Sequence, residues 1–170
     1  TPTFKTDGTK GKIKNVILLI GDGMGMAQAV AGYYANGNDL AIMKLKNMGF
    51  VRTYSASHFT TDSAASGTTY ACGVKTTNGF IGTTPDSQHI RSNAFGIYAH
   101  SASRKATSEI LAQLPGSKLD FFAAGCVTLW NKYAPEQVAE LSKAGFTIIN
   151  DYNKISENAS AKRIGVIAAD

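Results

Sequence analysis

Short apolar segments alternate with segments of helical spacing along this chain, and this alternation constrains the fold most. Four short runs rich in apolar residues are typical of buried strands: 14–20, 119–123, 146–150 and 163–168. Segments 107–114 and 135–144 carry helical spacing. In the segment 135–144, Pro135 suits the first turn of a helix and Gly145 suits the position after its end. The pattern predicts an α/β fold with a mostly parallel sheet sandwiched by helices. In such sheets ligands bind beyond the carboxyl ends of the strands.

The composition supports one compact domain over residues 1–170, because 44% of the residues are hydrophobic. The longest aliphatic run, 16–20, is too short to cross a bilayer, so we expect no membrane span. The chain begins at Thr1 rather than with methionine, which a removed secretion signal or a trimmed sequence would explain. Cys72 and Cys126 lack metal-ligand spacing, and the sequence leaves open whether they pair.

The net charge of +5 does not come from a nucleic-acid-binding tract. The one local concentration of basic residues is expected to be a solvated N-terminal face, as charge runs usually are. Its members are Lys5, Lys10, Lys12 and Lys14. We therefore expect no specific nucleic-acid partner.

A carboxylate follows the first predicted strand in the sequence GDGMG at positions 21–25. The glycines allow a sharp turn and place Asp22 at the carboxyl end of the strand. A dinucleotide-binding turn is one alternative, although the spacing is not G-x-G-x-x-G and Asp22 would repel a pyrophosphate. A plain turn is another. The first interpretation is that Asp22 binds a divalent cation.

The second motif is TDSAASGTTYACGVKT at positions 61–76. The composition of residues 55–69 alone is typical of a loop or linker. A serine at the start of a small-residue helix, however, lies where free backbone N–H groups favour an anion, which makes Ser63 a candidate nucleophile. The alternative is that Asp62 or Ser63 merely caps a helix.

These motifs resemble those of the alkaline phosphatase family. The segment at 61–76 is similar to the nucleophile motif, and KNVILLIGDGMG at 14–25 is similar to the N-terminal strand with its metal-binding aspartate. The segment AHSASRK at 99–105 resembles the one that delivers the phosphate-binding arginine, and DFFAAG at 120–125 resembles another strand and turn. The resemblance implies that residues 1–170 are part of a three-layer catalytic domain.

The resemblance also implies roles for single residues. Ser63 would be phosphorylated transiently and would bind zinc, and Asp22 would be shared by magnesium and one of two zinc ions. Arg104 would hold two phosphate oxygens, because a planar guanidinium matches phosphate bidentately. Asp62 would orient Arg104 rather than bind metal. His100 is expected to be structural, and His58 and His89 match no ligand of the family.

The chain departs from the family pattern at two places. Arg91 and Asn93 stand where magnesium ligands belong, so we expect that a segment is missing near 91–93. Family members also continue past Asp170, where further zinc ligands lie. One carboxylate and one serine do not make a two-zinc centre, so we expect the native polypeptide to be longer than this chain.

The sequence thus predicts a metal-dependent phosphatase with a phosphoserine intermediate, acting on small phosphate monoesters. The resemblance implies a homodimer in the periplasm or outside the cell. One alternative is a related phosphodiesterase, phosphonate hydrolase or mutase. Alternatives of other classes are a non-catalytic phosphate- or metal-binding fragment and, on the glycine turn alone, a nucleotide-binding oxidoreductase.

Overall fold

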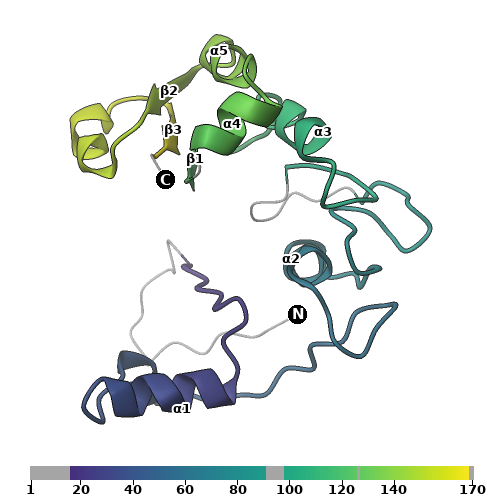
Figure 1. Ribbon diagram of the computed structural model, residues 1–170, viewed down its shortest axis with the longest axis vertical. Helices are drawn as coiled ribbons and strands as arrows, with labels where there is room; N and C mark the ends of the chain where they lie inside the picture. The colour runs from purple at the N-terminus through teal and green to yellow at the C-terminus, as the bar shows by residue number, and fades with distance from the viewer. Residues whose placement is uncertain (1–15, 91–97, 126, 169–170) are drawn as a thin grey trace, which may run out of the picture. The chain divides into compact units, whose positions relative to one another are not determined.

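The computed structural model describes residues 16–90, 98–125 and 127–168, and it divides into two compact units, Thr1–Phe50 and Val51–Asp170. We call them the N-terminal unit and the site unit (Figure 1). No helix among the described residues is long and apolar enough to cross a membrane. The prediction of a single domain over 1–170 stays a prediction.

The N-terminal unit contains helix α1 (Met26–Ala35) and the short helix η1 (Ala41–Lys44) in its described part. The prediction of a buried strand at 14–20 is wrong for residues 16–20, which form no strand and expose 52–90% of their surface. Residues 14 and 15 lie outside the described residues. A strand requires a hydrogen-bonded neighbour, and residues 21–50 offer no strand with which residues 16–20 could pair.

A parallel sheet in the site unit confirms the α/β class. Its strands are β1 (Phe121–Ala124), β2 (Phe146–Ile149) and β3 (Arg163–Ile167), in the order β1-β3-β2. The three strands lie within the segments predicted at 119–123, 146–150 and 163–168, except for Ala124. The central strand is buried on both faces from its second residue onward, as its continuous apolar run requires.

The described part of the site unit contains four α-helices: α2 (Ser63–Cys72), α3 (Thr107–Ala112), α4 (Val127–Tyr133) and α5 (Gln137–Lys143). The 3₁₀ helices η2 (Tyr152–Lys154) and η3 (Ser156–Asn158) follow β2. Helix α5 begins two residues after Pro135, and Gly145 follows it with φ +88°, the left-handed conformation expected after a helix end. The sequence pattern did not predict α1 or α4.

The sheet packs its two faces against different partners. On one face Trp130 of α4 and Leu141 of α5 are buried with Phe146 and Ile167. On the other face Ile164 and Val166 pack with side chains of the η2–η3 segment and the turn after it. This alternation follows from the two-residue period of a strand, and it gives the site unit its hydrophobic core.

Two residues of β3 fix the strands around it. Gly165 leaves room for the neighbouring strands, because a Cβ there would lie 2.5 Å from the Phe122 ring. The Arg163 guanidinium donates hydrogen bonds to the carbonyls of Leu119 (2.9 Å), Ala144 (2.9 Å) and Ser117 (2.8 Å). It therefore joins the segments that lead into β1 and β2.

Candidate active site

Helix α2 begins at Ser63 because Asp62 caps it. Asp62 has extended backbone angles (φ −96°, ψ 171°), and its Oδ1 accepts a hydrogen bond of 2.9 Å from the N–H of Ala65. The helix ends at Gly73, whose φ is +70°. The composition of residues 55–69 predicted a loop, and this prediction is wrong from residue 63 onward. A cap residue followed by small side chains suffices to form a helix here. Ser63 occupies the first helical position.

The second carboxylate oxygen of Asp62 binds two groups from distant parts of the chain. Oδ2 accepts from the N–H of Gly79 at 2.9 Å and from Nη1 of Arg104 at 3.2 Å. Burial alone would raise the pKa of this carboxyl. The hydrogen bonds from Ala65, Arg104 and Gly79, with the positive charge of Arg104, outweigh burial, so the pKa of Asp62 is below its usual value.

Arg104 reaches Asp62 through a pairing of two backbone segments. Ile81 and Ser101 form an antiparallel bridge, with N–H to O distances of 2.8 and 2.9 Å. The N–H of Arg104 then donates to the carbonyl of Gly79 at 2.7 Å. The structure thus brings together Ser63, Asp62 and Arg104, three of the four predicted site residues.

Ser63 and Arg104 line one groove of the site unit, together with the apolar side chains of Ile81, Ile110 and Leu111. Within the described residues, the N–H groups of Ser63 and Ala64 have no hydrogen-bond acceptor. Two free N–H groups at the start of a helix and a guanidinium are donors suited to a phosphate group. A hydroxyl that faces such an anion is placed for nucleophilic attack.

The predicted metal ligand Asp22 belongs to the N-terminal unit. It lies in a turn closed by a hydrogen bond from the N–H of Met24 to the carbonyl of Gly21 (3.3 Å), with Gly23 at φ +67°. Its side chain is exposed and makes no hydrogen bond to any described residue. The turn itself agrees with the prediction, and the metal role stays a prediction.

Histidines do not form a metal centre in the described part of the chain, where no three His, Cys, Asp or Glu side chains are grouped to hold an ion. The Nδ1 of His100 is 2.7 Å from the carbonyl of Gly82, and its ring stacks on that of His89 at 4.8 Å between centroids. His58 Nδ1 is 2.7 Å from the hydroxyl of Ser57. His100 thus belongs to the paired segments that carry Arg104.

Several sequence expectations fall on residues that the structure does not describe. The basic residues of the N-terminal face and the missing ligand positions are among these: Lys5, Lys10, Lys12, Lys14, Arg91 and Asn93. Cys126 also lies outside the described residues, so the question whether it pairs with Cys72 stays open.

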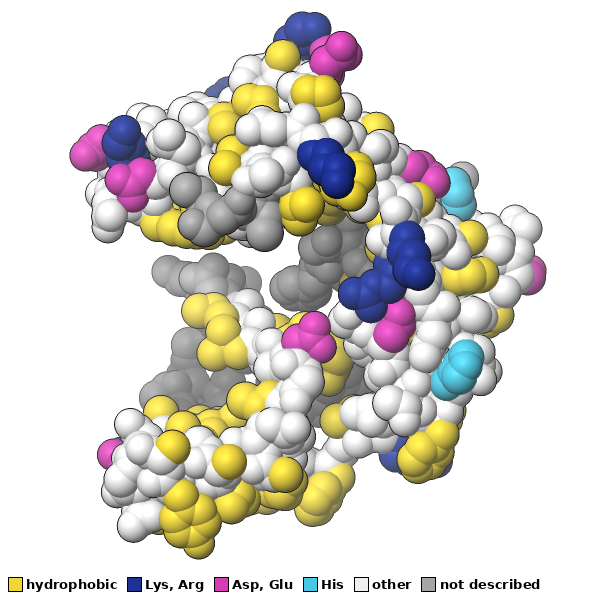
Figure 2. All heavy atoms as spheres, in the orientation of Figure 1, with side chains coloured by type: hydrophobic (Ala, Val, Ile, Leu, Met, Phe, Trp, Pro, Cys, Tyr) yellow, Lys and Arg dark blue, Asp and Glu magenta, His cyan; other side chains and the backbone are white. Residues whose placement is uncertain are grey.

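Basic side chains are dispersed on the face shown in Figure 2, and hydrophobic ones gather over the N-terminal unit.

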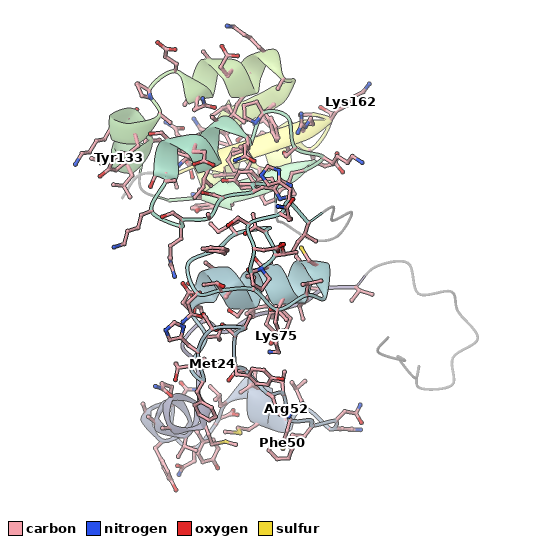
Figure 3. The ribbon with its side chains drawn as sticks, turned by 90° about the vertical axis from the view of Figure 1, so that its right-hand side faces the viewer. Met24, Phe50, Arg52, Lys75, Tyr133 and Lys162 are labelled. Carbon is pink, nitrogen blue, oxygen red and sulfur yellow. The ribbon has the colours of Figure 1, made fainter. Side chains whose placement is uncertain are left out.

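Lys75 lies beside α2 (Figure 3), with its Nζ 3.8 Å from the Tyr54 ring centroid. Arg52 lies 5.5 Å from the same ring. Both cations are therefore placed over an aromatic side chain of the site unit.

A family model for alkaline phosphatase matches residues 13–108, more than half of the chain. The chain belongs to the alkaline phosphatase family. Alkaline phosphatase H of Pseudomonas aeruginosa (strain UCBPP-PA14) is 34% identical over 192 residues, which cover 85% of this chain and 40% of that protein. Alkaline phosphatase 3 of Bacillus subtilis (strain 168) is 25% identical and covers 96% of this chain and 44% of its own length.

Solved structures of this family share the fold. Alkaline phosphatase from the Antarctic bacterium TAB5 has a TM-score of 0.79 at 28% identity, over 88% of this chain and 51% of that one. A mutant of that enzyme, with Mg bound in the M3 site, gives a TM-score of 0.80 at 29% identity over the same shares. This chain therefore spans about half the length of its relatives.

The alignment with the Pseudomonas enzyme also contains residues that have no counterpart here. It runs over 192 residues although it covers only 85% of this 170-residue chain. The relative thus carries residues inside the matched region that this chain lacks. The segment expected near 91–93 would account for this difference, and its position stays a prediction.

The sequence motifs did not indicate the contribution of one turn to the site. Asn78 and Gly79 both contact Asp62, and Gly79 also contacts the Arg104 segment. An Asn-Gly pair is typical of a turn, but it does not indicate which distant residues the turn contacts. Contacts over such sequence distances cannot be read from local pattern.

Proposed function

We propose that the full-length protein hydrolyses small phosphate monoesters through a phosphoserine intermediate on Ser63. The observation that supports this most is the groove that Ser63 shares with Arg104. Ser63 Oγ would attack phosphorus while the ester P–O bond breaks and the alcohol leaves with a proton. Water would then cleave the Ser63–phosphate bond and release inorganic phosphate.

The other residues of the site bind and orient. Arg104 would hold two non-bridging phosphate oxygens, and the free N–H groups at the start of α2 would bind the same anion. Asp62 holds the guanidinium at 3.2 Å and caps the helix, so it would set the position of both partners. These roles agree with those that the resemblance implies.

Two zinc ions and one magnesium ion are the cofactors that we propose, with Asp22 and Ser63 among their ligands. The TAB5 mutant with Mg bound supports metal use within the family. The donors of the described residues do not fit such a centre by themselves, because no three metal-binding side chains are grouped. The remaining ligands would lie outside the described part of the chain.

The proposal is tested with the full-length protein and two substrates, p-nitrophenyl phosphate and bis(p-nitrophenyl) phosphate. A phosphomonoesterase should cleave the monoester at least about a hundredfold faster, because only the monoester fills a site built for a terminal phosphate. Preference for the diester would support the related hydrolases instead. Phosphate binding without turnover would support a non-catalytic protein.

We also propose, from family membership, a homodimer that acts in the periplasm or outside the cell. Light scattering of the full-length protein should give twice the monomer mass. Fractionation should place the protein outside the cytoplasm, and a cytoplasmic monomer would contradict both proposals.

A further inference from the structure

The side chain of Asn78 holds the backbone directly before the candidate nucleophile. Its Oδ1 accepts a hydrogen bond of 3.2 Å from the N–H of Asp62, and its Nδ2 donates one of 3.0 Å to the carbonyl of Thr60. These two bonds fix the peptides that enter α2. Ser63 is the next residue, so a shift of this backbone would move its hydroxyl.

Gly79 contacts both partners of the Asp62–Arg104 pair. Its N–H donates to Asp62 Oδ2 at 2.9 Å, and its carbonyl accepts from the N–H of Arg104 at 2.7 Å. Its φ is +87°, a conformation that favours glycine, while the space around a Cβ is open. The two peptide groups that flank Gly79 therefore join the Asp62 carboxylate to the segment that carries Arg104.

The backbone of Asn78 is itself anchored to a turn that precedes the site. Its N–H donates to Ser57 Oγ at 3.0 Å, and the N–H of Ala56 donates to the carbonyl of Thr76 at 2.9 Å. Ser55, at the start of this turn, is buried and accepts from the N–H of His58 at 3.0 Å. The 55–58 turn thus anchors the backbone of Asn78, while Asn78 and Gly79 hydrogen-bond the Asp62 end of the site.

We infer that Asn78 is a positioning residue that fixes Ser63 relative to Arg104, with Gly79 as the backbone link between them. The inference rests on the proposed function for its kinetic consequences. The two residues act through Asp62 and the Arg104 segment. A residue that only stabilised the turn would change the melting temperature without changing affinity for phosphate.

The first experiment compares Asn78→Ala with Asn158→Ala in the full-length protein. Asn158 is a matched control, because its Nδ2 also donates to a backbone carbonyl, that of Lys154, in the η2–η3 segment. We expect N78A to lower kcat/KM and weaken inhibition by inorganic phosphate by about tenfold each, since two hydrogen bonds are lost. N158A should stay within about twofold. Equal behaviour of the two variants would overturn the inference.

A double-mutant cycle tests whether Asn78 acts through the arginine. In an Arg104→Ala background, N78A should change the phosphate inhibition constant less than about twofold, because the partner that it positions is gone. The same tenfold change in both backgrounds would show independent action and overturn the inference.

A second pair of variants tests the backbone link. Gly79→Ala and Gly73→Ala both place a side chain at positive φ (+87° and +70°) in open space, so they should cost similar stability. Only G79A should weaken phosphate inhibition. If G73A weakens it equally, the effect is general strain rather than positioning.

Hydrogen–deuterium exchange separates this inference from the proposed function, because it needs no activity. In N78A the peptide covering residues 60–66 should exchange faster, while peptides of β1 and β3 keep their rates. Unchanged exchange at 60–66 would overturn the positioning role. Faster exchange in a full-length protein that cleaves no phosphate ester would preserve it and contradict the proposed function alone.

Discussion

The N-terminal unit and the site unit hold their candidate functional residues by different means. In the site unit the Asp62 carboxylate accepts three hydrogen bonds, from Ala65, Gly79 and Arg104. In the N-terminal unit Asp22 is exposed and makes no side-chain hydrogen bond to a described residue. The candidate phosphate-binding groups are therefore fixed by contacts within their own unit, whereas among the described residues the candidate metal ligand is held only by its turn.

The apolar segments of the two units differ in the same way. Residues 16–20 expose 52–90% of their surface, whereas Ile164–Ile167 of β3 is buried between two strands and two packed layers. A strand is stable only where neighbours satisfy its backbone and cover its side chains. The difference shows why similar sequence patterns gave one correct strand prediction and one wrong one.

The largest effect is expected for Ser63→Ala, which removes the proposed nucleophile of the site unit. Turnover of p-nitrophenyl phosphate by the full-length protein should fall by at least about 10³-fold. Ser66→Ala is the matched control, because Ser66 lies one turn further along α2 and its hydroxyl donates to the carbonyl of Ser63. S66A should keep activity within a few-fold, and equal losses in both variants would contradict the assignment.

The next prediction concerns the weakly held residue of the other unit. Asp22→Asn keeps the side-chain shape but removes the charge that offsets a divalent cation, so metal content should fall. Elemental analysis of zinc and magnesium in the full-length protein measures this directly. Asp39→Asn, which removes an exposed ion pair with Lys44 in the same unit, should leave the metal content unchanged. Unchanged stoichiometry in D22N would exclude Asp22 as a ligand.

A smaller effect is expected for Arg104. Arg104→Ala should weaken phosphate inhibition by about ten- to a hundredfold, because charge-assisted hydrogen bonds are lost. Arg104→Lys should retain part of the affinity, since lysine supplies a charge without the bidentate geometry. Lys105→Ala is the control for charge. Wild-type inhibition constants in both Arg104 variants would contradict the proposed phosphate contact.

The smallest effect is a dependence of stability on pH through Asp62. Its pKa is lower in the folded protein than its usual value, so the ionised carboxylate stabilises the fold above the unfolded-state pKa of about 3.9. This contribution should be lost as the pH falls through the folded-state pKa. Urea unfolding between pH 3 and 7 should therefore show a weaker pH dependence in Asp62→Asn than in the wild type. Identical slopes would contradict the role of the hydrogen bonds.

Local signals in the sequence predicted the parts of the structure that local physics determines. Asp62 followed by small residues predicted the start of α2, and Gly145 predicted the end of α5. The pairing of Ile81 with Ser101, and the contact of Asp62 with a residue 42 positions later, are long-range and have no local signature. The resemblance to a family, rather than spacing, connected Ser63 with Arg104.

The central claim is that Ser63 receives the phosphoryl group, and trapping that group tests it most directly. The full-length protein would be mixed with a phosphate monoester, quenched in acid within the first turnovers, digested and mapped by mass spectrometry. The account predicts a phosphate on Ser63 in the peptide that contains residues 61–75, and none there in Ser63→Ala. A phosphate on any other residue, with Ser63 unmodified while the substrate is turned over, would contradict it.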